Sequence, residues 1–418
     1  MTHLPAGRDP AVGGLGHNGP VRRGLLVVAL PIVLVAPATA SSLPLATRLA
    51  NALAVPGNAP SASGAVAVDL LTGRTVFQRN PDAPLAPASN EKLAVTFAAL
   101  RELGAGYRFR TEIFGRGVQD GAVWRGDLVL KGYGDPTLDG LQVDRLATQV
   151  AQLGITSVTG RVLADESWFD TTRTAPGWKS SFYVNECPPL SALVVDRARY
   201  DGHVARQPAI AAAGVLKQRL RLHGVTTGAV GLGRASESWL ALAQVESEPL
   251  TDVLRDMDRE SDNFEAEMLL KTIGAEVGTG GTSAAGVAIV LRDLAADGVP
   301  LAGVRMFDGS GLSLDDRITA RALAALLLVA WNDDELHAAL WAALPVAGVN
   351  GTLEDRMQRA PARGAVRAKT GTTDRASALS GYVRDRFVFA VLQNGWPVSS
   401  WSARKAQDRF ATALASAS

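Results

Sequence analysis

Hydrophobic and polar residues alternate on both sides of a glycine-containing turn in SGAVAVDLLTGRTVFQRN, residues 63–80, and this pattern predicts a β-hairpin. The next apolar segment, SNEKLAVTFAALRELG at 89–104, has helical spacing. Pro87 lies just before it, and Gly104 is a plausible end. We therefore expect a hairpin followed by a helix that begins near residue 89.

Residues 107–245 have a different pattern. Short apolar runs such as GDLVLKG alternate with clusters of Gly, Pro and Asp, which indicates short strands. Only AAAGVLKQRLRLHG, residues 211–224, favours a helix in this region. We interpret 107–245 as an inserted, mostly-β domain.

Helical periodicity returns after residue 246, in LTDVLRDMDRE, NFEAEMLLKTIGAEVG, SAAGVAIVLRDLAADG and ARALAALLLVAWND. The sequence then indicates three strands, GAVRAKTGTT, ALSGYVRD and RFVFAVLQNG, the last two paired across a turn at 384–386, and a final helix at 402–417. Strands before and after a run of helices predict one sheet whose first and last strands are neighbours. The expected fold class is α+β, an antiparallel sheet flanked by helices, formed by residues 41–106 and 246–418.

The first 40 residues have the pattern of an export signal. Arg22 and Arg23 precede the apolar run GLLVVALPIVLVA, and ATA follows at 38–40. The apolar run is short for a membrane span, although an uncleaved anchor remains an alternative. The paired arginines also permit a twin-arginine route. We expect an exported protein of the periplasm, cell wall or extracellular space, which meets the membrane only transiently during export.

Composition excludes several classes of function. The net charge of +1 gives no electrostatic reason to expect a nucleic-acid partner. The five histidines show no metal-ligand spacing, so we expect no metal and no cofactor. GLGHNG at 14–19 matches a dinucleotide fingerprint but lies in the predicted export signal, and we reject it. The single cysteine, Cys187, is expected to be a small buried residue.

Three short motifs carry candidate chemistry: SNEK at 89–92, SDN at 261–263, and KTG at 369–371 followed by Thr372. Ser89 and Lys92 are three residues apart and share one face of a helix. A serine nucleophile needs a base, and lysine is a base only when neutral, so the pKa of Lys92 must be lowered. We expect Lys369, as a second cation, to help lower it.

The other two motifs supply binding groups. Ser261 offers a second hydroxyl that can pass a proton, and Asn263 offers an amide that can hold a peptide group. The KTG segment is predicted to be an edge strand, on which Gly371 leaves room for a substrate. Lys369, Thr370 and Thr372 are predicted to bind a terminal carboxylate. A second S-x-x-K match, SARK at 402–405, is interpreted as a solvated helix face.

S-x-x-K, S-D-N and K-T-G in this order are typical of serine β-lactamases and penicillin-binding proteins. The chain resembles the serine-type D-alanyl-D-alanine carboxypeptidases and endopeptidases, the low-molecular-mass class C penicillin-binding proteins. LKGYGDPTL, ECPPLSAL, FDGSGLS and LPVAGVNGTL resemble segments of the same family. The resemblance implies a β-lactamase/transpeptidase-like domain with one inserted domain between the first two motifs.

The resemblance also implies roles for single residues. Ser89 would be the acylated nucleophile and Lys92 its general base. Ser261 would relay a proton and Asn263 would hold a substrate amide. Lys369 and Thr372 would bind the carboxylate, and the backbone N–H groups of Ser89 and Thr372 would form the oxyanion hole. FDGSGLS is interpreted as a tight turn near the site.

The implied function is that of an exported D-Ala-D-Ala carboxypeptidase. It would remove the terminal D-alanine of peptidoglycan stem peptides, and β-lactam antibiotics such as penicillin would inhibit it covalently. A DD-endopeptidase or a serine β-lactamase with the same residues remains an alternative. A catalytically silent wall-binding protein on the same fold is a further one.

Overall fold

The computed structural model describes residues 43–200, 202–236 and 238–417, so the predicted export signal at 1–40 lies outside the described residues. Within the described ranges, no helix is long and apolar enough to cross a membrane.

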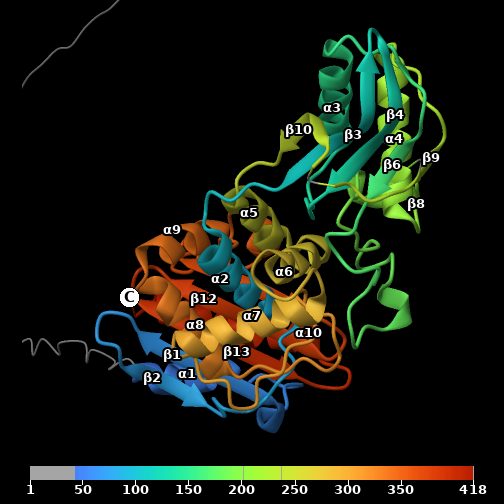
Figure 1. The fold of residues 1–418 in the computed structure, drawn as a ribbon. Helices are drawn as coiled ribbons and strands as arrows, with labels where there is room; N and C mark the ends of the chain where they lie inside the picture. The colour runs from blue at the N-terminus through green and yellow to red at the C-terminus, as the bar shows by residue number, and fades with distance from the viewer. Residues whose placement is uncertain (1–42, 201, 237, 418) are drawn as a thin grey trace, which may run out of the picture. The chain divides into compact units, whose positions relative to one another are not determined.

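The central element is a five-stranded antiparallel sheet with the order β11-β12-β13-β1-β2. Its strands are β1 (Ser63–Asp69), β2 (Thr75–Arg79), β11 (Val366–Thr372), β12 (Ala376–Val383) and β13 (Phe387–Asn394). In Figure 1 the early strands, in blue, lie beside the late strands, in red, because β1 pairs with β13. The predicted hairpin, the pairing across 384–386 and the edge position of β11 are confirmed.

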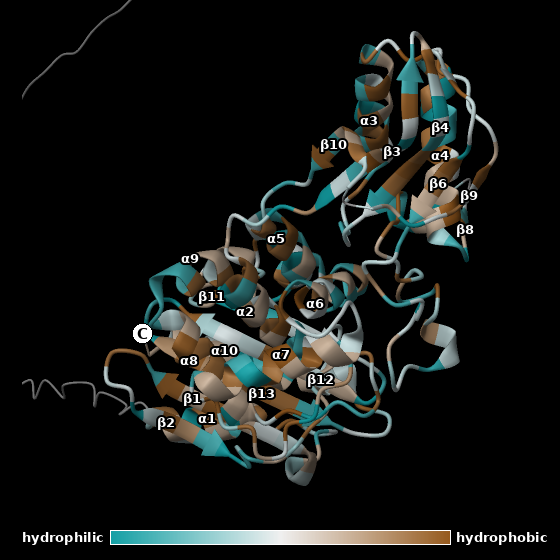
Figure 2. Ribbon diagram, viewed as in Figure 1, coloured by the Kyte–Doolittle hydropathy of each residue, from teal (hydrophilic) through white to brown (hydrophobic). Residues whose placement is uncertain are grey.

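Helices cover both faces of this sheet, which confirms the predicted α+β class. They are α1 (Leu45–Leu53), α2 (Lys92–Leu103), α5 (Leu250–Glu260), α6 (Asn263–Val277), α7 (Ser283–Ala296), α8 (Ala320–Trp331), α9 (Asp334–Ala343) and α10 (Ser400–Ala415). Alternate residues of β1 enter two different cores: Val66 packs with α2 and α8, whereas Ala67 packs with α1 and α10. The apolar residues of β1 and α8 are brown in Figure 2.

Helix α2 lies inside the larger core, and its residues 92–100 are all buried. It ends at Gly104, as predicted, where a φ of 81° favours glycine. Its start differs from the prediction, because residues Ala88–Glu91 form a 3₁₀ turn and the α-helix begins at Lys92. Ser89 therefore lies in the tight turn that leads into the helix.

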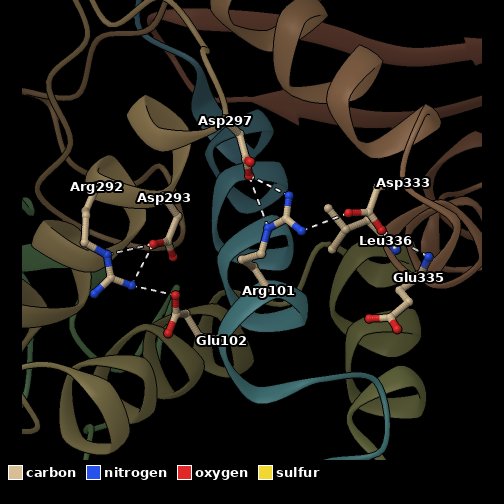
Figure 3. A network of polar contacts seen from close by, with 8 residues as sticks. All are labelled: Arg101, Glu102, Arg292, Asp293, Asp297, Asp333, Glu335 and Leu336. Carbon is tan, nitrogen blue, oxygen red and sulfur yellow. Dashed lines mark hydrogen bonds and ion pairs between the residues drawn. The ribbon is translucent and has the colours of Figure 1, made fainter.

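Two ion-pair clusters, each centred on one arginine, stabilise the C-terminal end of α2 (Figure 3). Arg101 donates to Asp297, which follows α7, and to Asp333, which caps α9, at distances of 2.7–2.8 Å for the closest contacts. Arg292 of α7 pairs with Glu102 and with Asp293. The pairs are partly exposed, so each contributes little by itself, but together they link α2 to both neighbouring helices.

Residues 110–246 form a second sheet with the order β10-β3-β4-β6-β9 and a separate core. The elements are β3 (Arg110–Asp120), β4 (Val123–Gly132), β5 (Ser157–Val158), β6 (Val162–Asp165), β9 (Val230–Leu232), β10 (Leu240–Glu246), α3 (Gly140–Gln152) and α4 (Pro208–Leu222). A small hairpin, β7 (Arg199–Tyr200) with β8 (His203–Val204), follows the long connection after β6. The chain enters and leaves this region at paired residues, since Arg110 lies opposite Glu246.

Helix α4 matches the predicted helix, but the pattern reading missed α3. The signal was present: Val143, Leu146, Ala147 and Val150 have helical spacing and are buried, and Asp139 begins a capping box. The inserted region therefore contains more helix than we predicted.

Candidate active site

The three sequence motifs meet at one cavity of about 430 Å³. Five of the eight predicted site residues line it: Ser89, Ser261, Thr370, Gly371 and Thr372. The other three, Lys92, Asn263 and Lys369, lie next to it through hydrogen bonds with these residues or with one another. The sequence motifs did not indicate the other residues that line the cavity, which include Thr352, Glu354, Arg356 and Arg404.

Ser89 is presented by a strained backbone. Ala88, just before it, has a φ of 46°, a left-handed conformation that costs about 1 kcal/mol for a residue with a side chain. Gly311 packs directly against this turn, since a Cβ at residue 311 would lie 2.0 Å from the Ala88 carbonyl oxygen. The turn that carries Ser89 is therefore held by close packing against the 307–316 loop.

Lys92 is fully buried and its amine has three partners. Nζ lies 2.8 Å from Asn263 Oδ1, 2.8 Å from the Ser310 carbonyl oxygen and 3.1 Å from Ser89 Oγ. The first two partners can only accept hydrogen bonds, so they take two N–H groups. A neutral amine then has its lone pair left for the Ser89 hydroxyl, which is the arrangement that a general base needs.

Burial is the largest cause that lowers the pKa of Lys92, while Asp308 and Asp262 raise it. Desolvation is thus a larger cause than the second cation that we expected, Lys369. Repulsion between the two lysine charges acts on both, and burial followed by the charge of Lys92 lowers the pKa of Lys369 to about 7. Both lysines therefore have a lower pKa than an exposed lysine and lose their proton at a lower pH.

Ser261 and Lys369 form a second hydroxyl–amine pair. Lys369 Nζ lies 2.8 Å from Ser261 Oγ and also donates to the Thr370 carbonyl oxygen at 3.1 Å. Ser261 ends α5 with a φ of 61°, which turns the chain directly into α6. Fully buried Asp258 lies one turn earlier on α5, accepts from Thr96 at 2.8 Å, and has a pKa that burial raises to about 6.

Both polar atoms of the Asn263 side chain form hydrogen bonds to other residues of the chain. Oδ1 accepts from Lys92, and Nδ2 donates to the Glu186 carbonyl oxygen at 3.1 Å. One N–H of Nδ2 has no bond to the described residues and is the part available to a substrate. In this structure Asn263 therefore orients the amine of Lys92, a role that sequence reasoning did not assign to it.

Strand β11 approaches the turn that carries Ser89 very closely. A Cβ at Gly371 would lie 2.9 Å from the Pro87 carbonyl oxygen and 3.0 Å from the Ser89 nitrogen. Asn90, fully buried, donates to the Lys369 carbonyl oxygen at 3.0 Å and ties the turn to the strand. We predicted that Gly371 leaves room for a substrate. The structure shows that it leaves room for the backbone of the turn that carries Ser89.

Buried acids behind the nucleophile are the main feature that sequence reasoning missed. Glu267 Oε1 accepts from the backbone N–H groups of Gly309 at 3.0 Å and Ser310 at 2.8 Å. Asp308 accepts from Gly311 and Ser313 within the same loop. These bonds fix the carbonyl of Ser310, which receives a hydrogen bond from Lys92.

These acids are held in a low-dielectric environment. Burial, followed by the charge of neighbouring Asp308, raises the pKa of Glu267 to about 8 and that of Asp316 to about 12. Glu267 therefore carries a proton at neutral pH. The spacing of Asn263 and Glu267, four residues apart on α6, was the available sequence signal.

Two sequence candidates outside the three motifs are Cys187 and the SARK segment. Cys187 is fully buried, as predicted. The SARK segment differs from our interpretation as a solvated face, because Ser402 is buried against Gly57 while Arg404 is exposed.

Comparisons with known proteins assign the chain to a family. Residues 45–207 and 202–417 match the model of the D-Ala-D-Ala carboxypeptidase 3 (S13) family. A D-alanyl-D-alanine carboxypeptidase of Actinomadura sp. (strain R39) is 32% identical over 419 residues, covering 80% of this chain and 78% of the relative. Carboxypeptidase DacB of Mycolicibacterium smegmatis is 31% identical over 414 residues, covering 93% of this chain and 87% of the relative.

The fold is shared with a solved structure. The crystal structure of penicillin binding protein 4 (dacB) from Haemophilus influenzae has a TM-score of 0.77 and 22% identity, covering 89% of this chain and 98% of that one. The predicted β-lactamase/transpeptidase-like fold with an insertion is consistent with this match. Because the family model spans nearly all the described residues, the chain belongs to the D-Ala-D-Ala carboxypeptidase 3 (S13) family and is an enzyme, a serine-type D-Ala-D-Ala carboxypeptidase.

Proposed function

We propose that Ser89 is the nucleophile of this carboxypeptidase and that Lys92 is its general base. The observation that carries the proposal is the geometry of Lys92 Nζ, whose two acceptor-only partners leave its lone pair for the hydroxyl of Ser89, 3.1 Å away. The amine is fully buried, which disfavours the charged form.

In the acylation step, Ser89 Oγ attacks the carbonyl carbon of the penultimate D-alanine and its proton moves to Lys92 Nζ. The backbone N–H groups of Ser89 and Thr372 are proposed to stabilise the oxyanion. Ser261, hydrogen-bonded to Lys369, then relays the proton held by Lys92 to the departing amine, which leaves Lys92 neutral again. The C–N bond breaks, the terminal D-alanine leaves, and an ester to Ser89 remains.

In the second step, water attacks the ester and regenerates the free serine. Lys92 is again the group placed to take a proton, now from the attacking water. The substrate's terminal carboxylate is proposed to bind at Lys369, Thr370 and Thr372. A charged Lys369 favours this binding, so the pKa of about 7 sets an upper pH limit for substrate affinity.

The proposed substrates are peptidoglycan stem peptides, and the proposed inhibitors are β-lactam antibiotics. A second crystal structure of the Haemophilus influenzae protein contains a β-lactam, in a match with a TM-score of 0.72 and 22% identity. We further propose that the chain is exported, since Arg22 and Arg23 precede an apolar run and an A-x-A site. The sequence, rather than the described structure, supports export.

A DD-endopeptidase activity of the same site is the second candidate. Two Bdellovibrio bacteriovorus endopeptidases share the fold at 18% identity, with TM-scores of 0.58 and 0.53. The catalytic steps are the same for both activities, because only the leaving amine differs.

Product analysis on three substrates tests the proposed function. We expect the enzyme to release D-alanine from an acyl-D-Ala-D-Ala peptide, and Ser89→Ala to release none. Cross-linked muropeptide and nitrocefin, assayed in parallel, measure endopeptidase and β-lactamase activity. D-alanine release by Ser89→Ala at the wild-type rate would contradict the assignment of the nucleophile.

A further inference from the structure

A second cavity, of about 730 Å³, lies over α10 beside the catalytic one. We call it the α10 groove and define it by Arg48, Arg356, Trp401, Arg404, Lys405 and Arg409. Arg356 and Arg404 line both cavities. The α10 groove therefore adjoins the site that contains Ser89, with these two arginines between them.

The α10 groove has an excess of positive charge. Among the residues that the structure describes, its only lining carboxylate is Asp408, and that carboxylate is occupied by Arg356, at 3.0 Å from Nε and 2.6 Å from Nη2. In the described part of the chain, the cations of Arg404, Lys405 and Arg409 have no carboxylate within 4.0 Å. Because the whole chain has a net charge of only +1, this cluster is a local feature that suits an anionic ligand.

An aromatic ring adds a binding platform to these charges. Trp401 is 69% exposed at the start of α10, and Lys405 Nζ lies 4.4 Å from the ring centroid. Tryptophan and arginine are among the residues that contribute most of the binding energy at interfaces. The α10 groove thus offers both apolar contact and cations.

The position of Arg404 gives the α10 groove a direction relative to the substrate. Arg404 Nη2 lies 3.5 Å from Thr372 Oγ1, at the place proposed to bind the carboxylate of the leaving D-alanine. The α10 groove therefore extends away from Ser89 on the leaving-group side. A leaving group longer than one residue has to pass over Arg404 toward Lys405 and Arg409.

We propose that the α10 groove binds an acidic peptide extension of the leaving group. The occupant is a carboxylate-bearing peptide chain attached to the departing amine, and the free cations of α10 attract its carboxylates. This inference rests on the proposed function, because it assumes acyl transfer to Ser89. It assigns Lys405 and Arg409 a role in choosing between substrates and no role in the chemical step.

The test compares three synthetic substrates with the same acyl group. The first has D-alanine as leaving group, the second has D-lysine whose side-chain amine carries two D-glutamates, and the third has D-lysine whose side-chain amine carries two D-glutamines, so that all three leaving groups keep the carboxylate next to the departing amine. The variant is the double substitution Lys405→Glu and Arg409→Glu, neither of which lines the catalytic cavity. Lys217→Glu with Arg221→Glu is the matched control, because it makes the same charge change at the same spacing on α4.

For the α10 variant we expect kcat/KM to fall about tenfold or more for the acidic substrate and less than about twofold for the other two. The α4 control should behave like the wild type on all three substrates. If the α10 variant no longer acylates with penicillin, the milder pair Lys405→Gln and Arg409→Gln replaces it, with a smaller loss expected on the acidic substrate alone.

Three results would overturn the inference while leaving the proposed function intact. One is equal cleavage of the acidic substrate by wild type and variant. Another is an equal loss on the acidic and the neutral extended substrates. The third is loss of binding to anionic lipid vesicles without any change in cleavage, which would assign the α10 groove to a membrane surface. Failure of the wild type to cleave the first substrate would instead contradict the proposed function.

Discussion

At the residue scale, the reactivity of Ser89 depends on what surrounds Lys92. Its partners come from three different parts of the chain: the nucleophile turn, α6 and the 307–316 loop. A lysine with only two such partners would be free to rotate its amine away from Ser89. The third partner, the Ser310 carbonyl, depends in turn on Glu267, which binds two N–H groups of the same loop.

Glu267 is therefore a positioning residue for Lys92, and its variants can be predicted. Glu267→Gln retains the carbonyl that accepts from Gly309 and Ser310 and has the shape of the protonated acid, so acylation by penicillin should stay within about threefold of wild type. Glu267→Ala loses both bonds and should slow acylation about tenfold or more. Stopped-flow acylation with a chromogenic β-lactam measures both. An equal loss in the two variants would contradict the positioning role.

The titration of Glu267 also predicts how stability changes with pH. Its carboxyl ionises near 4.5 when exposed in the unfolded chain and at about 8 in the folded protein. Between these values the folded state binds more protons, so the stability contributed by the protonated acid is lost as pH rises. The melting temperature of the wild type should fall from pH 5 to pH 8 by more than that of Glu267→Gln. Parallel melting curves over this range would contradict the raised pKa.

The motif residues could be predicted because their chemistry shows in short sequence patterns, whereas the supporting acids could not. SNEK, SDN and KTG supply Ser89, Ser261 and Lys369 directly. Glu267 and Asp308 look like ordinary charged residues in sequence, and their burial appears only when α2, α6 and the 307–316 loop pack together. For the same reason the sequence could not show that desolvation is the largest cause of the lowered pKa of Lys92, since desolvation is a property of the packed structure.

At the element scale, the contact between β11 and the nucleophile turn sets the geometry of the site. The absence of a side chain at Gly371 allows the strand to approach the backbone of Pro87 and Ser89. Asn90 holds the two elements together through the Lys369 carbonyl. On its outer side β11 has an isolated bridge between Arg367 and Val346, and an edge strand of this kind suits the addition of a substrate strand farther along, toward Thr372.

Gly371→Ala should therefore impair catalysis more than folding. The added methyl group would push the turn and the strand apart by several tenths of an ångström, and we expect kcat/KM to fall about 100-fold. Gly106→Ala is the matched control, because nothing lies within 4 Å of its Cβ. Rates of penicillin acylation and melting temperatures of both variants test this. Wild-type acylation by Gly371→Ala would contradict the close contact.

The helices and strands show which features could be predicted from the sequence pattern and which could not. The hairpin at 63–80 shows alternating apolar and polar residues in the sequence, and the pairing of the last two strands followed from the turn between them. The 3₁₀ turn at 88–91 was not predictable, because its shape depends on packing against Gly311 and Gly371. The missed helix α3 has a clear apolar period, but it is surrounded by Gly, Pro and Asp clusters that indicated loops.

At the scale of the whole molecule, we propose that 107–245 is a domain inserted into the catalytic one. Its sheet and helices have their own core, and Arg110 and Glu246, where the chain enters and leaves, are paired. The long connection after β6 nevertheless reaches the active site. Trp178 Nε1 donates to Asp308 at 2.7 Å, and the Glu186 carbonyl accepts from Asn263.

This connection predicts that the insert influences catalysis. Trp178→Phe removes one hydrogen bond from Asp308 and should slow acylation about tenfold through the 307–316 loop. Trp168→Phe is a matched control, because Trp168 Nε1 is buried with no hydrogen-bond partner among the described residues. Acylation kinetics with penicillin measure both variants. Equal rates for the two variants would indicate that the connection does not support the site.

The central claim is that Ser89 becomes acylated, and mass spectrometry of the intact protein after incubation with penicillin tests it most directly. We predict one covalent adduct with the mass of one penicillin, located on the peptide that contains Ser89, and none in Ser89→Ala. A wild-type protein without an adduct, or a Ser89→Ala variant with the same adduct, would contradict the account.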